Sequence, residues 1–148
     1  MMNIKKGNQN GFTLIEVLIG ITVFAIGILA LTIMQIGAVK GNSSAGSLTE
    51  ASTVGQDKME ELMSLNYLDP LLDDTDGDGT AGLNDAAIAT ADRTDTYTGT
   101  TNIQYNIFWN IAVDNPFTNT KTLRVLVNWN ERGRQRTVTM DSLKNANT

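Results

Sequence analysis

An uncharged stretch near the N-terminus restricts the possible folds of this chain more than any other feature. Residues 12–39 are 28 positions long, and Glu16 is their only ionisable side chain. Val17–Val39 alone comprises 23 uncharged residues, which as an α-helix span roughly 30 Å, the thickness of a bilayer's hydrocarbon core. A buried core helix this apolar would need burial on all sides, and a secretory signal peptide would be shorter and end at a small-residue cleavage site. The sequence therefore predicts a transmembrane helix over 12–40.

The charges that flank this stretch predict its orientation. Lys5 and Lys6 precede it, only Lys40 follows closely, and the whole chain has a net charge of -5. The positive-inside rule then places the short N-terminus in the cytoplasm and residues 41–148 across the membrane. Because the chain is acidic overall, it offers no broad attraction to a phosphate backbone, and nucleic acid is not expected as a partner.

The composition removes several classes of function. The 148 residues include no Cys and no His, which excludes disulfides, Cys/His zinc sites and catalytic sets that depend on imidazole or thiolate. No arrangement of the remaining polar residues suggests catalysis, so we do not expect an enzyme.

The residues at the start of the apolar stretch form a specific motif. Gly11-Phe12-Thr13-Leu14-Ile15-Glu16, preceded by the basic segment MMNIKKGNQN, resembles the cleavage and N-methylation motif of type IV prepilins. The resemblance implies that a prepilin peptidase removes a leader of residues 1–11 by cutting between Gly11 and Phe12, and methylates the new N-terminus at Phe12.

Glu16 is a functional candidate for two reasons. A lone carboxylate in an apolar segment is costly unless it is paired. The resemblance implies a partner, the N-terminal amine of Phe12 in an adjacent subunit, so that Glu16 would form an assembly salt bridge. The alternative is a carboxylate that reaches the cytoplasmic head groups.

The rest of the chain predicts a helix packed on a sheet. Apolar residues recur at mostly helical spacing over 44–66, although Asn42–Gly46 weaken the join to the first helix, and Pro70 ends any helix. Residues 103–113, 123–129 and 136–140 alternate apolar and polar side chains, which predicts three antiparallel strands of a meander. We therefore expect an α+β protein with the type IV pilin fold, in which a long N-terminal helix, transmembrane in its first half, packs on an antiparallel C-terminal sheet.

The segment between helix and sheet contains a candidate calcium loop. In the Asp-rich loop 73–85, acids occupy the first, third, fifth and twelfth positions of the calcium-loop pattern, with Gly at the sixth. Such spacing converges oxygen ligands on one point, and the predicted metal ligands are Asp74, Asp76, Asp78, the carbonyl of Thr80, and Asp85. The alternative is an ordinary acidic surface turn. If Ca²⁺ binds, its role would be structural.

The segments GQDKMEEL, YNIFWNIAVD and LRVLVNWNERGRQRTV also resemble minor pilins of the PilV type. This resemblance implies a minor pilin that initiates or modifies a type IV pilus. Its partners would be other pilin subunits, major and minor, together with prepilin peptidase and the pilus assembly platform. It would reside in the bacterial inner membrane as a single-pass protein, and then in the pilus fibre at the cell surface.

Two other functions remain open at this point. A minor pseudopilin of a type II secretion system would share the same leader and anchor. A membrane-anchored, calcium-dependent adhesin or binding module would use the helix only as an anchor, and its leader would not be cleaved.

Overall fold

The computed structural model describes residues 11–146, which fall into two compact units, one up to Asn42 and one from Ser43 onward. The predicted leader lies outside the described residues, except for Gly11. Both units contain part of a single helix, α1 (Leu14–Ser64).

The N-terminal unit consists of the apolar part of α1. By length and composition this helix is able to cross a membrane, and none of its apolar window is buried within the chain. Its few hydroxyls are satisfied locally, because the Thr22 and Thr32 hydroxyls donate to the carbonyls of Leu18 and Ile28, one turn earlier, at 2.8 and 2.9 Å. Between residues 14 and 39 the helix therefore presents neither a charge beyond Glu16 nor an unpaired threonine hydroxyl to its surroundings.

The second helical segment continues the first without interruption. The residues Asn42–Gly46, expected to weaken the join, are helical in the structure, and α1 ends at Ser64, six residues before Pro70. Helix propensity is a weak determinant, and tertiary contacts hold this stretch: the Ser44 hydroxyl donates to the carboxylate of Glu131 at 2.9 Å, and Ser47 is buried.

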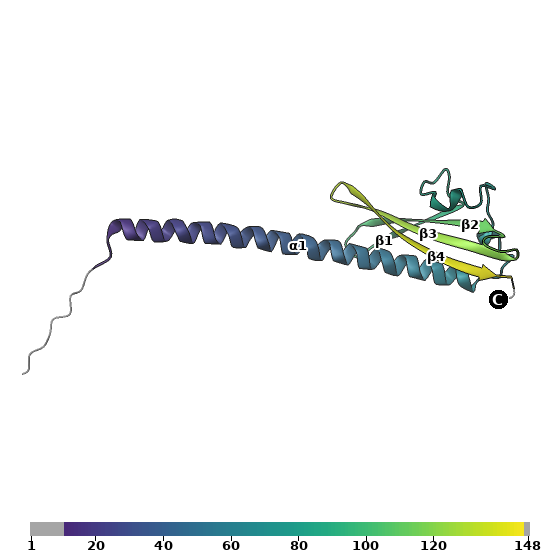
Figure 1. The fold of residues 1–148 in the computed structure, drawn as a ribbon, viewed down its shortest axis with the longest axis horizontal. Helices are drawn as coiled ribbons and strands as arrows, with labels where there is room; N and C mark the ends of the chain where they lie inside the picture. The colour runs from purple at the N-terminus through teal and green to yellow at the C-terminus, as the bar shows by residue number, and fades with distance from the viewer. Residues whose placement is uncertain (1–10, 147–148) are drawn as a thin grey trace, which may run out of the picture. The chain divides into compact units, whose positions relative to one another are not determined.

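Four antiparallel strands form the sheet of the C-terminal unit (Figure 1). They are β1 (Arg93–Thr98), β2 (Gln104–Val113), β3 (Thr120–Glu131) and β4 (Arg134–Asn145), in that spatial order. The three predicted strands are confirmed as parts of β2, β3 and β4. Strand β1 was not predicted, because it lies in the Asp- and Thr-rich segment and exposes almost all of its side chains.

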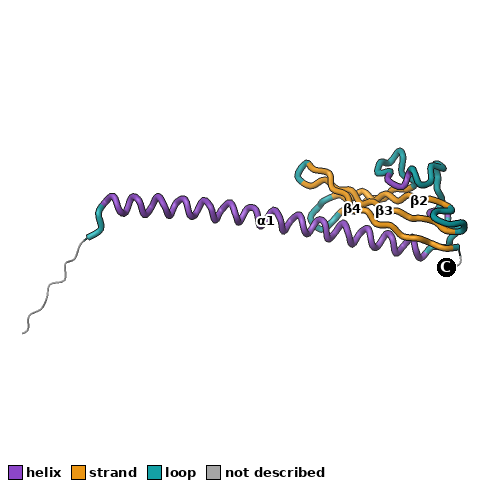
Figure 2. Tube along the Cα trace, viewed as in Figure 1, coloured by secondary structure: helices purple, strands orange, loops and turns teal. Residues whose placement is uncertain are grey.

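One face of the sheet packs against the C-terminal part of α1 (Figure 2). Ala51 and Leu62 of the helix are fully buried in one cluster with the apolar residues of β2 and β3, including both tryptophans. Gly55 permits the close approach, since a Cβ there would lie 3.2 Å from Val127 and Met140. The predicted apolar stripe of the helix is thus confirmed, except that Leu48 is half exposed.

The opposite face of the sheet is covered by the segment between α1 and β1. Of the two short 3₁₀ helices in this segment, η1 (Pro70–Leu72) packs on the helix side, where Leu72 belongs to the core cluster, and η2 (Gly82–Asn84) lies on the opposite face. Leu83 of η2 is buried there, as are Phe108 and Leu126 on the strands. The sheet is therefore buried on both faces at its centre. The α+β class predicted from the sequence is confirmed.

Candidate functional site

The first candidate site is the N-terminal end of α1. Thr13 caps the helix: its carbonyl and its hydroxyl both accept from the Glu16 N–H, at 3.1 and 3.3 Å. Glu16 stands three residues after the cap, where a carboxylate is favoured by the helix dipole and by the capping-box pattern. The predicted pair of residues at the cleavage point, Gly11 and Phe12, precedes this cap and is exposed; Phe12 has 84% of its surface accessible.

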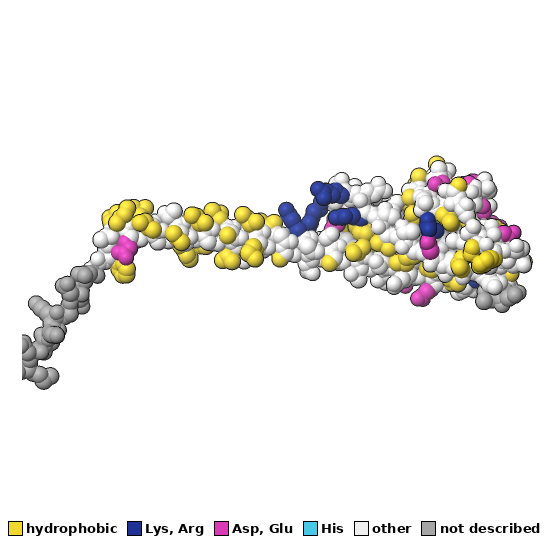
Figure 3. All heavy atoms as spheres, viewed as in Figure 1, with side chains coloured by type: hydrophobic (Ala, Val, Ile, Leu, Met, Phe, Trp, Pro, Cys, Tyr) yellow, Lys and Arg dark blue, Asp and Glu magenta, His cyan; other side chains and the backbone are white. Residues whose placement is uncertain are grey.

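The helix that follows carries a continuous exposed apolar surface. Apolar side chains gather along the N-terminal part of α1 in Figure 3, and Glu16 is the one acidic side chain between residues 12 and 39. Soluble monomers rarely expose apolar patches beyond a few hundred Å². This surface therefore needs lipid or the apolar helices of other subunits as its surroundings.

The second candidate site is the Asp-rich loop. Asp74, Asp76 and Asp78 each place a carboxylate oxygen within 4.8 Å of the others. Backbone amides orient two of these groups: Asp74 accepts from the Gly77 and Gly79 N–H groups at 2.8 and 3.0 Å, and Asp76 accepts from the Asp78 N–H at 3.3 Å. Gly77 and Gly79 both have positive φ, a conformation that glycine adopts without strain.

The electrostatics of this loop reflect the crowding of its carboxylates. Partial desolvation raises the pKa of the Asp78 carboxyl, and the negative charges of Asp76, Asp74 and Asp85 raise it further. The Asp78 carboxylate also lies where the Cβ of any other residue at position 82 would be, so only a glycine leaves room for it. Carboxylate oxygens are hard donors of the kind that Ca²⁺ prefers, and three of them would be part of a shell of about six to eight oxygens.

The other two predicted ligands are placed differently. Asp85 is not among the three carboxylates that converge, although its charge acts on Asp78. Its backbone carbonyl accepts from the Asn110 side chain at 2.8 Å. Thr80 lies on the exposed surface after Gly79.

Two buried residues that the sequence did not single out fix the loop to the sheet. Asp92 accepts from the backbone N–H and the hydroxyl of Thr75, and its other oxygen accepts from the Ile111 N–H at 2.8 Å. Asn110 donates to the carbonyls of Leu83 and Asp85 and accepts from the Asp92 N–H. The one signal in the sequence was that Asn110 shares a face of its strand with the apolar Phe108 and Ala112.

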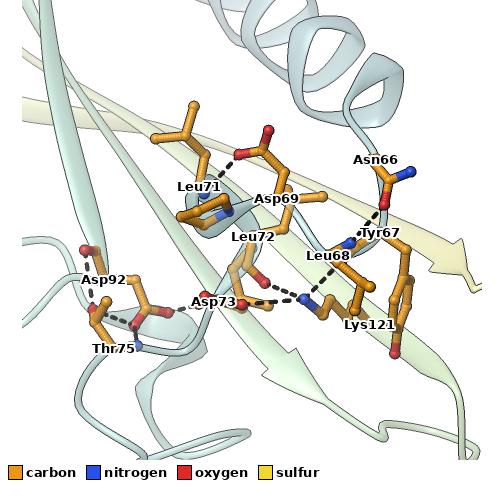
Figure 4. Close-up of polar contacts among 12 residues, drawn as sticks. Asn66, Tyr67, Leu68, Asp69, Leu71, Leu72, Asp73, Thr75, Asp92 and Lys121 are labelled. Atoms are coloured by element: carbon orange, nitrogen blue, oxygen red, sulfur yellow. Dashed lines mark hydrogen bonds and ion pairs between the residues drawn. The ribbon is translucent and has the colours of Figure 1, made fainter.

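A buried lysine holds the beginning of the loop (Figure 4). Lys121 of β3 is 4% exposed, and its ammonium group donates to the carbonyls of Tyr67 and Leu72 at 2.9 and 2.7 Å and pairs with Asp73 at 3.4 Å. It also lies 4.7 Å from the centre of the Tyr67 ring. The position of the loop is thus set by the sheet at both ends.

Comparison with known proteins bears on the first site. A family model of the prokaryotic N-terminal methylation motif matches residues 6–32, a range that includes Gly11, Phe12 and Glu16. No curated protein and no solved structure matches the chain. The long apolar helix with its four-stranded antiparallel sheet is consistent with the type IV pilin fold. Motif and fold together support a type IV pilin-like or pseudopilin protein, and point to a structural protein.

Proposed function

We propose that this protein is a minor pilin, a subunit that initiates or modifies a type IV pilus. The observation that carries the proposal is the methylation motif at residues 6–32, together with the helix it begins, whose apolar N-terminal part is not buried within the chain. Before assembly the helix waits in the inner membrane, with its N-terminus in the cytoplasm. During assembly it joins a bundle of other pilin helices.

The chemistry of the N-terminus supports this mechanism. Cleavage after Gly11 frees the amine of Phe12, and methylation leaves it positively charged. A carboxylate in an apolar bundle needs a charged partner, and the amine of a neighbouring subunit supplies one to Glu16. The pair attracts strongly because the bundle excludes water, whereas the rest of the bundle gains its stability from apolar packing.

Substitution of Glu16 tests the assembly role. Glu16→Gln keeps the size of the side chain and removes the charge, and we expect it to leave cleavage intact while the protein disappears from sheared filaments and accumulates in the membrane. The matched control is Glu60→Gln, which removes an exposed carboxylate from the C-terminal part of the same helix. Equal incorporation of both variants would contradict the assembly salt bridge.

A pseudopilin of a type II secretion system is the second candidate, because it is favoured by the same motif and the same helix. The two differ in where the processed chain resides. A minor pilin is found in extracellular fibres, and its deletion reduces their number. A pseudopilin stays in the cell envelope, and its deletion blocks the export of a protein substrate while surface fibres remain.

We also propose that the loop 73–85 binds a structural Ca²⁺. Asp74, Asp76 and Asp78 would supply the central carboxylates, and Thr80 and Asp85 would complete the shell after local adjustment. The convergence of three carboxylates within 4.8 Å supports this proposal. Bound Ca²⁺ would offset their repulsion and stabilise the loop by mass action.

Calorimetric titration of the full chain in detergent tests the calcium proposal. We expect heat of binding and a raised unfolding temperature with Ca²⁺, and neither in a variant that carries both Asp74→Asn and Asp76→Asn. Asp57→Asn, on the exposed face of α1, is the control for a general loss of negative charge. Absence of heat in the natural sequence would contradict the site.

A further inference from the structure

The hairpin between β3 and β4 carries a concentration of positive charge on an otherwise acidic chain. Three of the five residues 132–136 are arginines, at 132, 134 and 136. The two turn residues, Arg132 and Gly133, have φ of 51° and 78°, as in a type I′ turn, which holds the strands in close register. The Gly133 N–H also donates to the Asn130 side chain at 2.9 Å. The charges are therefore presented on a well-defined turn.

The pairing register places two of these arginines on one face. Arg134 is opposite Glu131 and Arg136 is opposite Trp129, and residues that face each other across antiparallel strands project to the same side. Trp129 belongs to the core on the helix side of the sheet. Arg134 and Arg136 thus continue that face at the end of the sheet, where the core stops, and Arg136 is half exposed.

The base of the hairpin is fixed to the beginning of the second unit. The Ser44 hydroxyl donates to the Glu131 carboxylate at 2.9 Å, and the Arg136 guanidinium lies 3.8 Å from the same carboxylate oxygen. Next to this contact is a cavity of about 220 Å³ whose lining includes Leu48 and Arg136. The hairpin is therefore anchored close to Ser44.

Ser44 is only five residues past Val39, the end of the uncharged segment. A chain of five residues reaches at most roughly 18 Å even when it is fully extended. The head-group layer of a bilayer extends roughly 5–8 Å beyond the hydrocarbon core. When the segment spans a membrane, this short connection therefore keeps the residues around Ser44 within reach of the phosphates.

We infer that the β3–β4 hairpin binds the phosphate groups of anionic phospholipids at the membrane surface where α1 emerges. The inference rests on the membrane placement in the proposed function and goes beyond it by assigning a lipid-binding surface to the soluble unit. Guanidinium groups suit this ligand, because their planar fork donates two hydrogen bonds to one phosphate. The contact holds the hairpin at the bilayer until the subunit is withdrawn into a filament.

A fluorescent label on the hairpin tests this contact in the full chain. Because the chain contains no Cys, Gln135→Cys provides a unique labelling position. The protein is reconstituted into vesicles of phosphatidylcholine alone, or of phosphatidylcholine with about one third phosphatidylglycerol. Quenching by nitroxides on the lipid head groups then reports contact of the hairpin with the surface. A second label, at Ile26→Cys, reports insertion of the span through quenching by acyl-chain nitroxides.

We expect quenching of the hairpin label in anionic vesicles, weaker quenching in neutral ones, and a decrease as salt is added. Removing two cations with Arg134→Gln and Arg136→Gln should lower the equilibrium constant for contact on the order of twentyfold. Replacing the same residues by Lys keeps the charge, so it should retain most of the quenching. This pair of variants separates lost charge from a damaged hairpin.

Three outcomes would overturn the inference while leaving the membrane placement intact. The first is a quenched span label together with an unquenched hairpin label. The second is hairpin quenching that is equal in neutral and anionic vesicles. The third is hairpin quenching that follows protein density instead of lipid charge, which would assign the arginines to an acidic neighbouring subunit. An unquenched span label would contradict the membrane placement itself, and the inference with it.

Discussion

Asn110 offers the sharpest test of how the sheet positions the Asp-rich loop. Its side chain is 2% exposed and makes three hydrogen bonds to backbone groups: it donates to the Leu83 and Asp85 carbonyls at 3.2 and 2.8 Å and accepts from the Asp92 N–H at 3.0 Å. In Asn110→Ala these three groups lose their partner inside the protein. Each buried group left without a partner costs about 1–3 kcal/mol.

The expected loss of stability is about 3 kcal/mol, the lower end of the sum, because water can enter the space that the side chain leaves. For a unit of this size the corresponding fall in the unfolding temperature is more than about 10 °C. Both tryptophans lie in the sheet core of the C-terminal unit, so their fluorescence reports its unfolding by urea in the full chain. The control is Asn106→Ala, a partly buried Asn on the same strand. A loss below about 1 kcal/mol in Asn110→Ala, or an equal loss in both variants, would refute the reasoning.

Three further predictions concern the same unit. Gly55→Val places a branched side chain where a Cβ would already lie 3.2 Å from Val127. We expect urea unfolding to show a loss of about 1–3 kcal/mol in the free energy of unfolding. The control Gly46→Val, where a Cβ meets open space, should lose far less. The hydrogen bond from the Thr100 N–H to Glu50 lowers the pKa of that carboxyl. The stability that the Glu50 carboxylate contributes is therefore present above the unfolded pKa and disappears as the pH falls through the lower folded pKa. Between about pH 5 and pH 3 the unfolding temperature should consequently fall less steeply in Glu50→Gln than in the natural sequence. Desolvation and the neighbouring carboxylates raise the pKa of Asp78, so its charge opposes folding above the unfolded pKa. Without Ca²⁺, the unfolding temperature of Asp78→Asn should match or exceed that of the natural sequence, and Ca²⁺ should no longer raise it. A marked destabilisation of Asp78→Asn without Ca²⁺ would contradict this account.

The sequence predicted the elements that have a strong periodic pattern. The alternation over 103–113 and 123–129 identified the central strands, because their apolar side chains face the core on a period of two. The uncharged stretch identified the first half of α1 for a similar reason, since its length and composition leave few alternatives. The predicted helix was given a start at residue 12, whereas α1 begins at Leu14, where the Thr13 hydroxyl accepts from the Glu16 N–H; this cap was not predicted.

The parts that the sequence did not predict depend on tertiary contacts. Strand β1 has mostly exposed side chains and exists because its backbone pairs with β2, which leaves no apolar pattern to detect. The long helix was expected to continue past residue 40, but with a weakened join at Asn42–Gly46; this stretch is helical, because tertiary contacts such as Ser44 to Glu131 override weak propensities. The anchors of the candidate calcium loop, Asp92 and Asn110, are 18 residues apart, and no local pattern relates them to the Asp residues that they position.

The most direct test of the central claim is the mass of the N-terminus. The protein is isolated from its native host in two fractions, sheared filaments and membranes, and analysed by intact-mass and N-terminal mass spectrometry. The account predicts a chain that begins at methylated Phe12 and occurs in the filament fraction. An uncut chain that begins at Met1 or Met2 and stays in the membrane would contradict it, and would leave the helix as an ordinary membrane anchor.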